Sequence, residues 1–175
     1  MRDIVVGRPE SSEYAPFFAG YVAKVFAGEI LEVLEDQRAR VVDGLSDLSD
    51  DRVDFRYAEG KWTVRQVLGH VNDAERVFGY RALCIARGEA APLPGFDEQL
   101  YMANAPFAEC AFADLLYEFD ALRRANVLLL RQLDEAAWRR QGTANGTPVT
   151  VRALAYIMAG HVEHHLGILR ERYQV

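Results

Sequence analysis

Three of the four histidines in the sequence lie within five residues of one another near its C-terminal end, at positions 161, 164 and 165. In a helix, where successive residues are about 100° apart, His161 and His165 lie one turn apart on the same face. The rest of that face is apolar and consists of Val151, Leu154, Ile157, Met158, Ile168 and Leu169. A buried imidazole needs partners for its ring nitrogens, and two imidazoles one turn apart can share a metal ion. The segment is therefore a candidate metal-binding helix.

The fourth histidine, His70, lies 91 residues before His161, at the edge of a second amphipathic stretch. The apolar stripe of this stretch consists of Val64, Val67, Val71, Ala74, Val77 and Phe78. Two helices that each direct imidazole toward a common core predict a three-histidine metal site made of His70, His161 and His165. Zinc, nickel and iron all accept imidazole, and three protein ligands leave a coordination position open for water or substrate, as in catalytic sites.

A simpler interpretation of one histidine on an apolar face is a core residue that hydrogen-bonds to the backbone or to a carboxylate. Three core-facing histidines are harder to explain in this way, because each of them adds a desolvated polar ring. His164 lies about 60° from His161, on the opposite side from His165, and so falls at the border of the apolar face. We expect His164 to orient a ligand or to face solvent.

The HVEHH segment differs from the HExxH motif of zinc proteases, in which a glutamate directly follows the first histidine and activates water. Here Glu163 comes two residues after His161, about 200° around the helix, and faces away from the predicted site. Asp73, one turn after His70, is either an imidazole-orienting carboxylate or an exposed helix acid. Cys84 would lie about 21 Å from His70 along a helix, which excludes it as a ligand of the same ion. These residues assign no general base.

Other catalytic motifs do not occur in the sequence, which has no glycine-rich phosphate loop, no nucleophile elbow and no Cys-x-x-Cys pair. Four further residues could line a pocket beside the second stretch, although packing explains each of them equally well. These are Trp62, Tyr80, Arg81 and Tyr101.

Length and composition predict a single globular domain over residues 1–175. The 26 acidic and 20 basic residues give a net charge of −6, and without a basic cluster we expect no nucleic-acid partner. Cys84 and Cys110 are too few for a disulfide framework and agree with a reducing cytoplasm. No stretch reaches the roughly 20 apolar residues of a membrane helix. We therefore expect a soluble, cytoplasmic protein that does not contact membranes.

Apolar residues at helical spacing predict four long helices, over residues 28–48, 63–87, 111–133 and 150–173. Residues 1–27 predict an irregular, aromatic N-terminal arm. Residues 89–109 predict a long crossover between the second and third helices, with a short helix at 96–102. A helical turn at 134–139 and a hairpin at 141–148 complete the chain. The fold class is all-α, a four-helix bundle with a long crossover between helices 2 and 3.

Two segments resemble signatures of the DinB/YfiT-like superfamily. The string KWTVRQVLGH at 61–70, followed by NDAER, is similar to its second-helix signature, and GHVEHH at 160–165 to its fourth-helix signature. The likeness covers nearly the whole chain, including the N-terminal arm and the LPGFD connector. It implies a four-helix bundle that binds a divalent metal ion, zinc or nickel, through His70, His161 and His165. It also implies a homodimer, and a metal ion that activates a low-molecular-weight thiol in transferases and isomerases.

The leading functional hypothesis is a metal-dependent enzyme whose ion acts as a Lewis acid on water or on a substrate thiol. Hydrolysis of a small molecule and thiol S-transfer, with a low-molecular-weight thiol as partner, are both open. The alternatives are a non-catalytic metal- or ligand-binding bundle and a structural bundle with ordinary core histidines.

Overall fold

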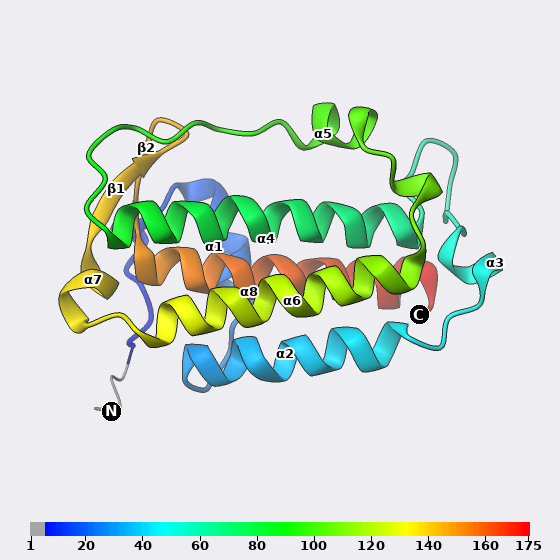
Figure 1. Cartoon of the computed structure of the whole chain (residues 1–175), viewed down its shortest axis with the longest axis horizontal. Helices are drawn as coiled ribbons and strands as arrows, with labels where there is room; N and C mark the ends of the chain where they lie inside the picture. The colour runs from blue at the N-terminus through cyan, green and yellow to red at the C-terminus, as the bar shows by residue number, and fades with distance from the viewer. Residues whose placement is uncertain (1–5) are drawn as a thin grey trace.

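Four long helices lie side by side along the molecule and enclose its core (Figure 1). They are α2 (Ile30–Leu45), α4 (Val64–Ala86), α6 (Phe112–Arg131) and α8 (Val151–Ile168). Helices α2 and α4 each pack against both α6 and α8. The computed structural model describes residues 6–175. It confirms the predicted four-helix bundle.

The ends of the helices follow the capping residues of the sequence. Thr63 Oγ1 accepts a hydrogen bond from the backbone nitrogen of Gln66 at 3.2 Å, and Gln66 Oε1 accepts one from the nitrogen of Thr63 at 2.9 Å. This reciprocal capping box starts α4 one residue after Thr63. Gly88, with φ of +87°, follows the end of α4 in the left-handed conformation that glycine favours. Thr150 caps α8 through the nitrogen of Ala153.

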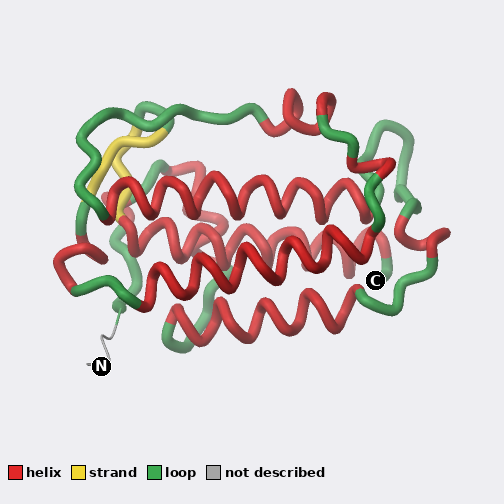
Figure 2. Tube along the Cα trace, in the orientation of Figure 1, coloured by secondary structure: helices red, strands yellow, loops and turns green. Residues whose placement is uncertain are grey.

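Helices α4 and α6 begin at the same end of the bundle, so the connection between them must travel its full length (Figure 1). This is the predicted crossover, and it carries α5 (Glu98–Asn104) and a single turn, η3 (Phe107–Glu109). The tube trace shows the crossover passing along the outside of the long helices (Figure 2). The predicted short helix at 96–102 is therefore present as α5, two residues further along.

A hairpin fixes the first part of the crossover, soon after the end of α4. Strands β1 (Gln141–Ala144) and β2 (Thr147–Thr150) pair antiparallel, and Asn145 and Gly146 at the turn both have positive φ, as a two-residue hairpin loop requires. Leu93 of the crossover donates to Thr143 O at 2.9 Å and accepts from the nitrogen of Asn145 at 3.0 Å. Because β2 leads directly into α8, this contact ties the crossover to the histidine-bearing helix. The predicted turn before the hairpin is α7 (Glu135–Arg139).

The N-terminal arm is more regular than predicted. Its first five residues lie outside the described ones, and the rest contains two 3-10 turns, η1 (Ser11–Glu13) and η2 (Pro16–Phe18), followed by α1 (Ala19–Ala23). These pieces are too short to show helical periodicity in the sequence, and so is α3 (Asp50–Val53) in the connection before α4. Glu13 holds the arm to α8, accepting from Thr150 Oγ1 and from Arg152 Nε, each at 2.7 Å.

The apolar core consists of two clusters, one toward each end of the bundle. Ile30, Leu34, Phe78, Val127 and Leu154 belong to the first cluster. Val41, Leu45, Val67, Phe119 and Val162 belong to the second. Between them lies a layer of buried polar side chains, comprising Gln37, His70, Asn72, Glu75, Arg123 and His161. The histidines therefore sit at mid-height in the bundle. Among the described residues, none of the helices has the length and hydropathy of a membrane-spanning segment.

Candidate metal centre

The structure brings the three core-facing histidines together. Nε2 of His161 lies 3.1 Å from Nε2 of His70 and 3.2 Å from Nε2 of His165. All three donor atoms lie within 4.8 Å of one another. His161 is 5% exposed, His70 3% and His165 9%. Imidazoles of α4 and α8 thus converge on one point, as the face geometry predicts.

Each of the first two histidines follows a glycine that lets another segment approach its helix closely. A Cβ on Gly160 would lie 2.0 Å from the backbone oxygen of Tyr21, and one on Gly69 would lie 2.6 Å from the ring of Phe107. The arm therefore packs directly on α8, and η3 packs directly on α4. Tyr21 in turn lies edge-on to His161, with ring centroids 5.4 Å apart.

All three imidazoles are neutral at neutral pH. Burial lowers the pKa of His70 to about 4, and the nearby His164 adds to this effect. Burial lowers the pKa of His165 to about 3, with further contributions from His70 and His164. The pKa of His161 falls well below its usual range because of burial and the neighbouring histidines. Neutral imidazole is the form that donates a lone pair to a metal ion.

The three donor atoms fit a divalent cation. Ligand nitrogens about 2.0–2.1 Å from a tetrahedral zinc ion lie about 3.3 Å from one another, close to the two separations at His161. Hydrogen bonds explain the cluster less well. A neutral imidazole carries one N–H, so a single ring nitrogen either donates or accepts one hydrogen bond, whereas His161 Nε2 faces the Nε2 atoms of two other histidines. Nδ1 of His165 is also buried without a hydrogen-bond partner among the described residues. The donor set therefore suits zinc or nickel, both of which accept imidazole.

The residues predicted to lie outside the cluster do so. His164 is half-buried and does not contribute to the converging nitrogens; its ring centroid lies 5.1 Å from that of His165. Glu163 faces α2, where it accepts from Gln37 Nε2 at 2.9 Å and pairs with Arg40. It cannot serve as a base at the histidines from that side of the helix.

The structure also tests the predictions made for Asp73 and Cys84. Asp73 is half-buried and burial raises its pKa, but the polar contacts of the His70 ring are to His161 and Glu98. The structure gives Asp73 no part in orienting that imidazole. Cys84 is half-buried and packs against the apolar core at the far end of α4, away from the histidines.

Glu98 is the site residue that sequence reasoning missed. Its Oε2 lies 4.0 Å from Nε2 of His70, and its side chain is 53% exposed. It reaches the histidines from α5, in the middle of the crossover, where no periodic pattern indicates a direction. The sequence predicted the crossover as a connection between two helices, and only the fold shows which carboxylate it brings to the histidines. Trp62 also contacts the site, with its ring centroid 5.0 Å from that of His70.

Two cavities meet at the histidines. The larger, of about 580 Å³, reaches His70 and His161, and the smaller, of about 320 Å³, reaches His165; Glu98 lines both. The larger cavity is mainly apolar, and its walls include five aromatic residues, Phe17, Phe18, Tyr21, Phe78 and Phe96. Of the four predicted pocket residues, Arg81 lines the larger cavity and Trp62 the smaller one. Tyr80 and Tyr101 line neither and are 56% and 43% exposed.

The fold and the site define a class of protein: a four-helix bundle with three neutral histidines of two helices converging at the base of an aromatic cavity. The sequence model of the DinB superfamily matches residues 33–169, and the chain belongs to this superfamily.

Similar sequences and solved structures agree with this membership. A protein of Oceanobacillus iheyensis named "Putative metal-dependent hydrolase" is 28% identical over 157 residues, covering 86% of this chain and 87% of its own. YfiT from Bacillus subtilis, described as a probable metal-dependent hydrolase with an unusual four-helix bundle topology, has a TM-score of 0.75 at 21% identity and covers 93% of each chain. The mycothiol-dependent maleylpyruvate isomerase has a TM-score of 0.66 at 17% identity, over 83% of this chain and 61% of its own. The two structures share the bundle fold with this protein.

Proposed function

We propose that the protein is a metal-dependent hydrolase of a small molecule, with a divalent cation, zinc or nickel, held by His70, His161 and His165. The observation that carries the proposal is the convergence of three buried, neutral Nε2 atoms at a cavity. A cation there would supply Lewis-acid chemistry, lowering the pKa of water and polarising a carbonyl or phosphoryl oxygen. The names of the sequence relatives support the same reaction class.

The chain's own residues supply the remaining parts of a hydrolytic site. Three histidine ligands leave room for water or substrate on the cavity side. Glu98 is placed to accept a proton from a water molecule in front of His70, because its carboxylate lies 4.0 Å from that ring and is open to the cavity. The aromatic walls position an apolar substrate and displace water around it.

Hydrolysis is the first reaction to test because the names of the sequence relatives give this reaction class and Glu98 is placed to accept a proton from water. Thiol S-transfer is the second reaction to test, since the protein shares its fold with a mycothiol-dependent isomerase. The cavity volume of about 580 Å³ suits a small-molecule substrate in either case.

Metal analysis and activity assays on untagged protein test the proposal. We expect about one zinc or nickel ion per chain, and hydrolysis of small esters or amides that chelation abolishes and the metal restores. A parallel panel pairs bacillithiol, mycothiol or glutathione with electrophilic acceptors. Metal that remains far below one per chain after incubation with zinc and nickel would favour a structural bundle. A fully loaded protein inactive in both panels would favour a non-catalytic metal-binding bundle.

The substitution Glu98→Gln tests the proton acceptor separately. It keeps the size of the side chain but removes its basic oxygen, so we expect kcat to fall by about 10²–10⁴-fold while the metal content stays unchanged. Glu109→Gln is the matched control, because Glu109 is an exposed glutamate of the same crossover. If Glu98→Gln also releases the metal, Glu98 is a ligand and not a base.

A further inference from the structure

Arg81 is a buried charge without a countercharge. The residue is 4% exposed, and its guanidinium donates from Nη2 to the backbone oxygen of Pro94 at 2.7 Å and lies 5.9 Å from the ring centroid of Phe96. Burial lowers the pKa of the Arg81 guanidinium. The side chain has five N–H donors, and one carbonyl and one ring leave most of them free. None of the Arg81 nitrogens is among the buried atoms that lack a hydrogen-bond partner, so its free N–H groups open onto the cavity that Arg81 lines.

The other buried arginines in residues 6–175 are paired. Arg123 contacts Glu75 at 2.6 Å, and Arg65 contacts Asp54 at 2.8 Å. Arg81 is thus the exception among the three buried arginines of the described chain, because no carboxylate of residues 6–175 forms an ion pair with it. It is also the one that lines the cavity of about 580 Å³ at the histidines.

Arg81 and two of the histidines line the same cavity, so one bound substrate can contact both ends of it. It follows His70 by eleven residues on α4, which places both on nearly the same face, about 16 Å apart along the axis. An unbroken aromatic wall joins the two ends of the cavity. Phe96, beneath Arg81, has its ring centroid 6.5 Å from that of Phe78, and Phe78 lies 5.8 Å from His161. The cavity therefore has a cation at one end, a flat apolar middle and the histidines at the other end.

We propose that Arg81 binds the carboxylate of the substrate, whose flat apolar body lies along Phe96 and Phe78 with its hydrolysable bond at the histidines. The substrate class is a small aryl or similarly flat carboxylic acid that carries an ester or amide. In the reaction, water supplies a hydroxyl to the acyl carbon and a proton to the departing alcohol or amine. The identity of this acid as the substrate rests on the proposed function, whereas its binding to Arg81 does not.

The charge of the cavity favours a carboxylate over a phosphate. A guanidinium binds a carboxylate through two parallel hydrogen bonds. Arg81 is the single arginine in the lining, and Asp97 and Glu98 also line the cavity. A dianion would meet more repulsion from these acids than a monoanion would.

Calorimetric titration of zinc-loaded and chelator-treated protein with three isosteres tests the proposal. The probes are 3-phenylpropionate, 3-phenylpropanamide and 2-phenylethylphosphonate. We expect the acid to bind about tenfold or more tightly than the amide, and more tightly than the phosphonate. Arg81→Gln should weaken acid binding by about 10- to 100-fold and leave amide binding unchanged, with Arg81→Lys intermediate. Arg87→Gln, an exposed arginine at the end of the same helix, should leave all three affinities unchanged.

Two outcomes would overturn the proposal. The first is equal binding of acid and amide by the wild-type protein, which is decisive even if Arg81→Gln does not fold. The second is undiminished acid binding by a folded Arg81→Gln variant. If that binding also disappears on chelation, the carboxylate binds at the metal instead. Acid binding that depends on Arg81 in a protein without hydrolytic activity would uphold the anion site and reject the proposed hydrolase.

Discussion

Adjacent histidines at the site have different environments. His165 directs Nε2 to within 3.2 Å of His161 Nε2, whereas the His164 ring lies tilted against Tyr21, with ring centroids 5.3 Å apart, and is half-buried at the edge of α8. The difference follows from the helix alone, since neighbouring residues point about 100° apart. Only one member of the pair can therefore belong to a site on the core face.

Alanine substitutions at the two positions should have unequal effects on metal binding. His165→Ala removes one of three predicted ligands, so we expect zinc affinity to fall by about 100-fold or more, beyond the usual loss for a residue that only orients a ligand. His164→Ala should stay within about tenfold of the wild type. Competition with a chromophoric chelator measures both, and thermal unfolding checks that both variants fold. Comparable losses would place His164 in the site.

The sequence is informative about residues only where a helix gives them a direction. His70, His161 and His165 could be placed on core faces because each belongs to a long periodic helix. Glu98 could not, because its position depends on how the crossover folds back over α4. Arg81 lies on α4 and was predicted as a possible pocket residue, but its burial against the crossover becomes visible only in three dimensions.

At the scale of elements, glycines determine how closely the arm and α8 approach. Gly160 has the backbone oxygen of Tyr21 where a Cβ would be, whereas Gly167, two turns later in α8, has no atom within 4 Å of that position. The arm lies against α8 at the first of these glycines and adds Tyr21 to the wall of the cavity.

Alanine at these two glycines should change stability in opposite directions. Gly160→Ala must push the arm away from α8, so we expect a loss of about 1–3 kcal/mol in the free energy of unfolding. Gly167→Ala has space and removes backbone freedom from the unfolded chain, so we expect a gain of about 0.5–1 kcal/mol. Urea unfolding followed by circular dichroism measures both. A neutral Gly160→Ala would show that the arm is not held against α8 in solution.

The elements themselves were largely predictable. Seven of the eight ends of the four long helices lie within three residues of the predicted bounds, because periodicity and caps such as Thr63 act locally. The exception is the end of the fourth helix, where α8 stops at Ile168 and a π-helical segment, η4 (Leu169–Tyr173), continues to the predicted bound. One-turn elements such as η1, η2 and α3 were missed, because three or four residues do not complete a helical period. Their positions are set by contacts such as that of Glu13 with Arg152, which joins residues far apart in sequence.

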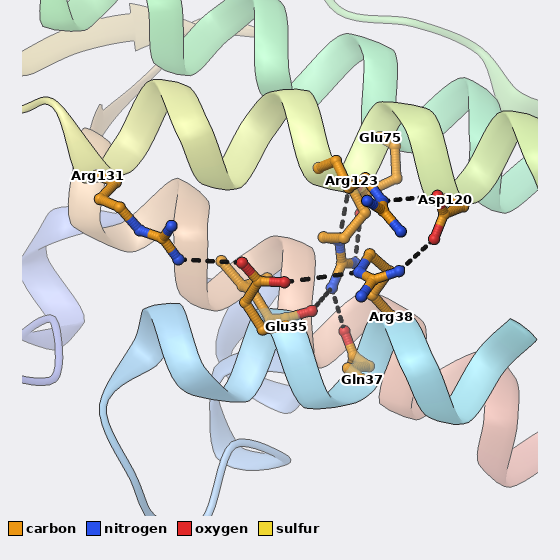
Figure 3. A network of polar contacts seen from close by, with 9 residues as sticks. Glu35, Gln37, Arg38, Glu75, Asp120, Arg123 and Arg131 are labelled. Carbon is orange, nitrogen blue, oxygen red and sulfur yellow. Dashed lines mark hydrogen bonds and ion pairs between the residues drawn. The ribbon is translucent and has the colours of Figure 1, made fainter.

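At the scale of the whole molecule, the bundle is organised around the polar layer between its two apolar clusters. Figure 3 shows Arg123 of α6 between Gln37 of α2 and Glu75 of α4. Arg123 donates to both carboxylate oxygens of Glu75, at 2.6 and 3.1 Å, and to Gln37 Oε1 at 2.6 Å. Gln37 then donates to the backbone oxygen of Ala159 on α8 at 2.8 Å. One network therefore joins all four helices next to His161.

This layer could not be predicted from the sequence. Gln37, Glu75 and Arg123 are residue types that usually face solvent, and each lies in a helix whose polar face carries similar residues. These side chains can be buried because each supplies hydrogen-bond partners to the others. This arrangement brings together three segments that are distant in the sequence. The predicted core was therefore largely correct in its apolar part, although Val77 and Ile168 are only half-buried, and incomplete in its polar part.

A double-mutant cycle on Glu75 and Arg123 tests whether this layer acts as one unit. Glu75→Gln leaves a buried guanidinium without its countercharge, so we expect a loss of about 3–5 kcal/mol in the free energy of unfolding, and a similar loss for Arg123→Met. The double variant should lose less than the sum, by about 1–3 kcal/mol, because neither charge is then left unpaired. Glu35→Gln is the control: it removes the partner of Arg131 in a partly exposed pair between α2 and α6, and should cost less than about 1 kcal/mol. Additive losses at Glu75 and Arg123 in urea unfolding would show that the two charges are stabilised independently, and the polar layer would then not be a single network.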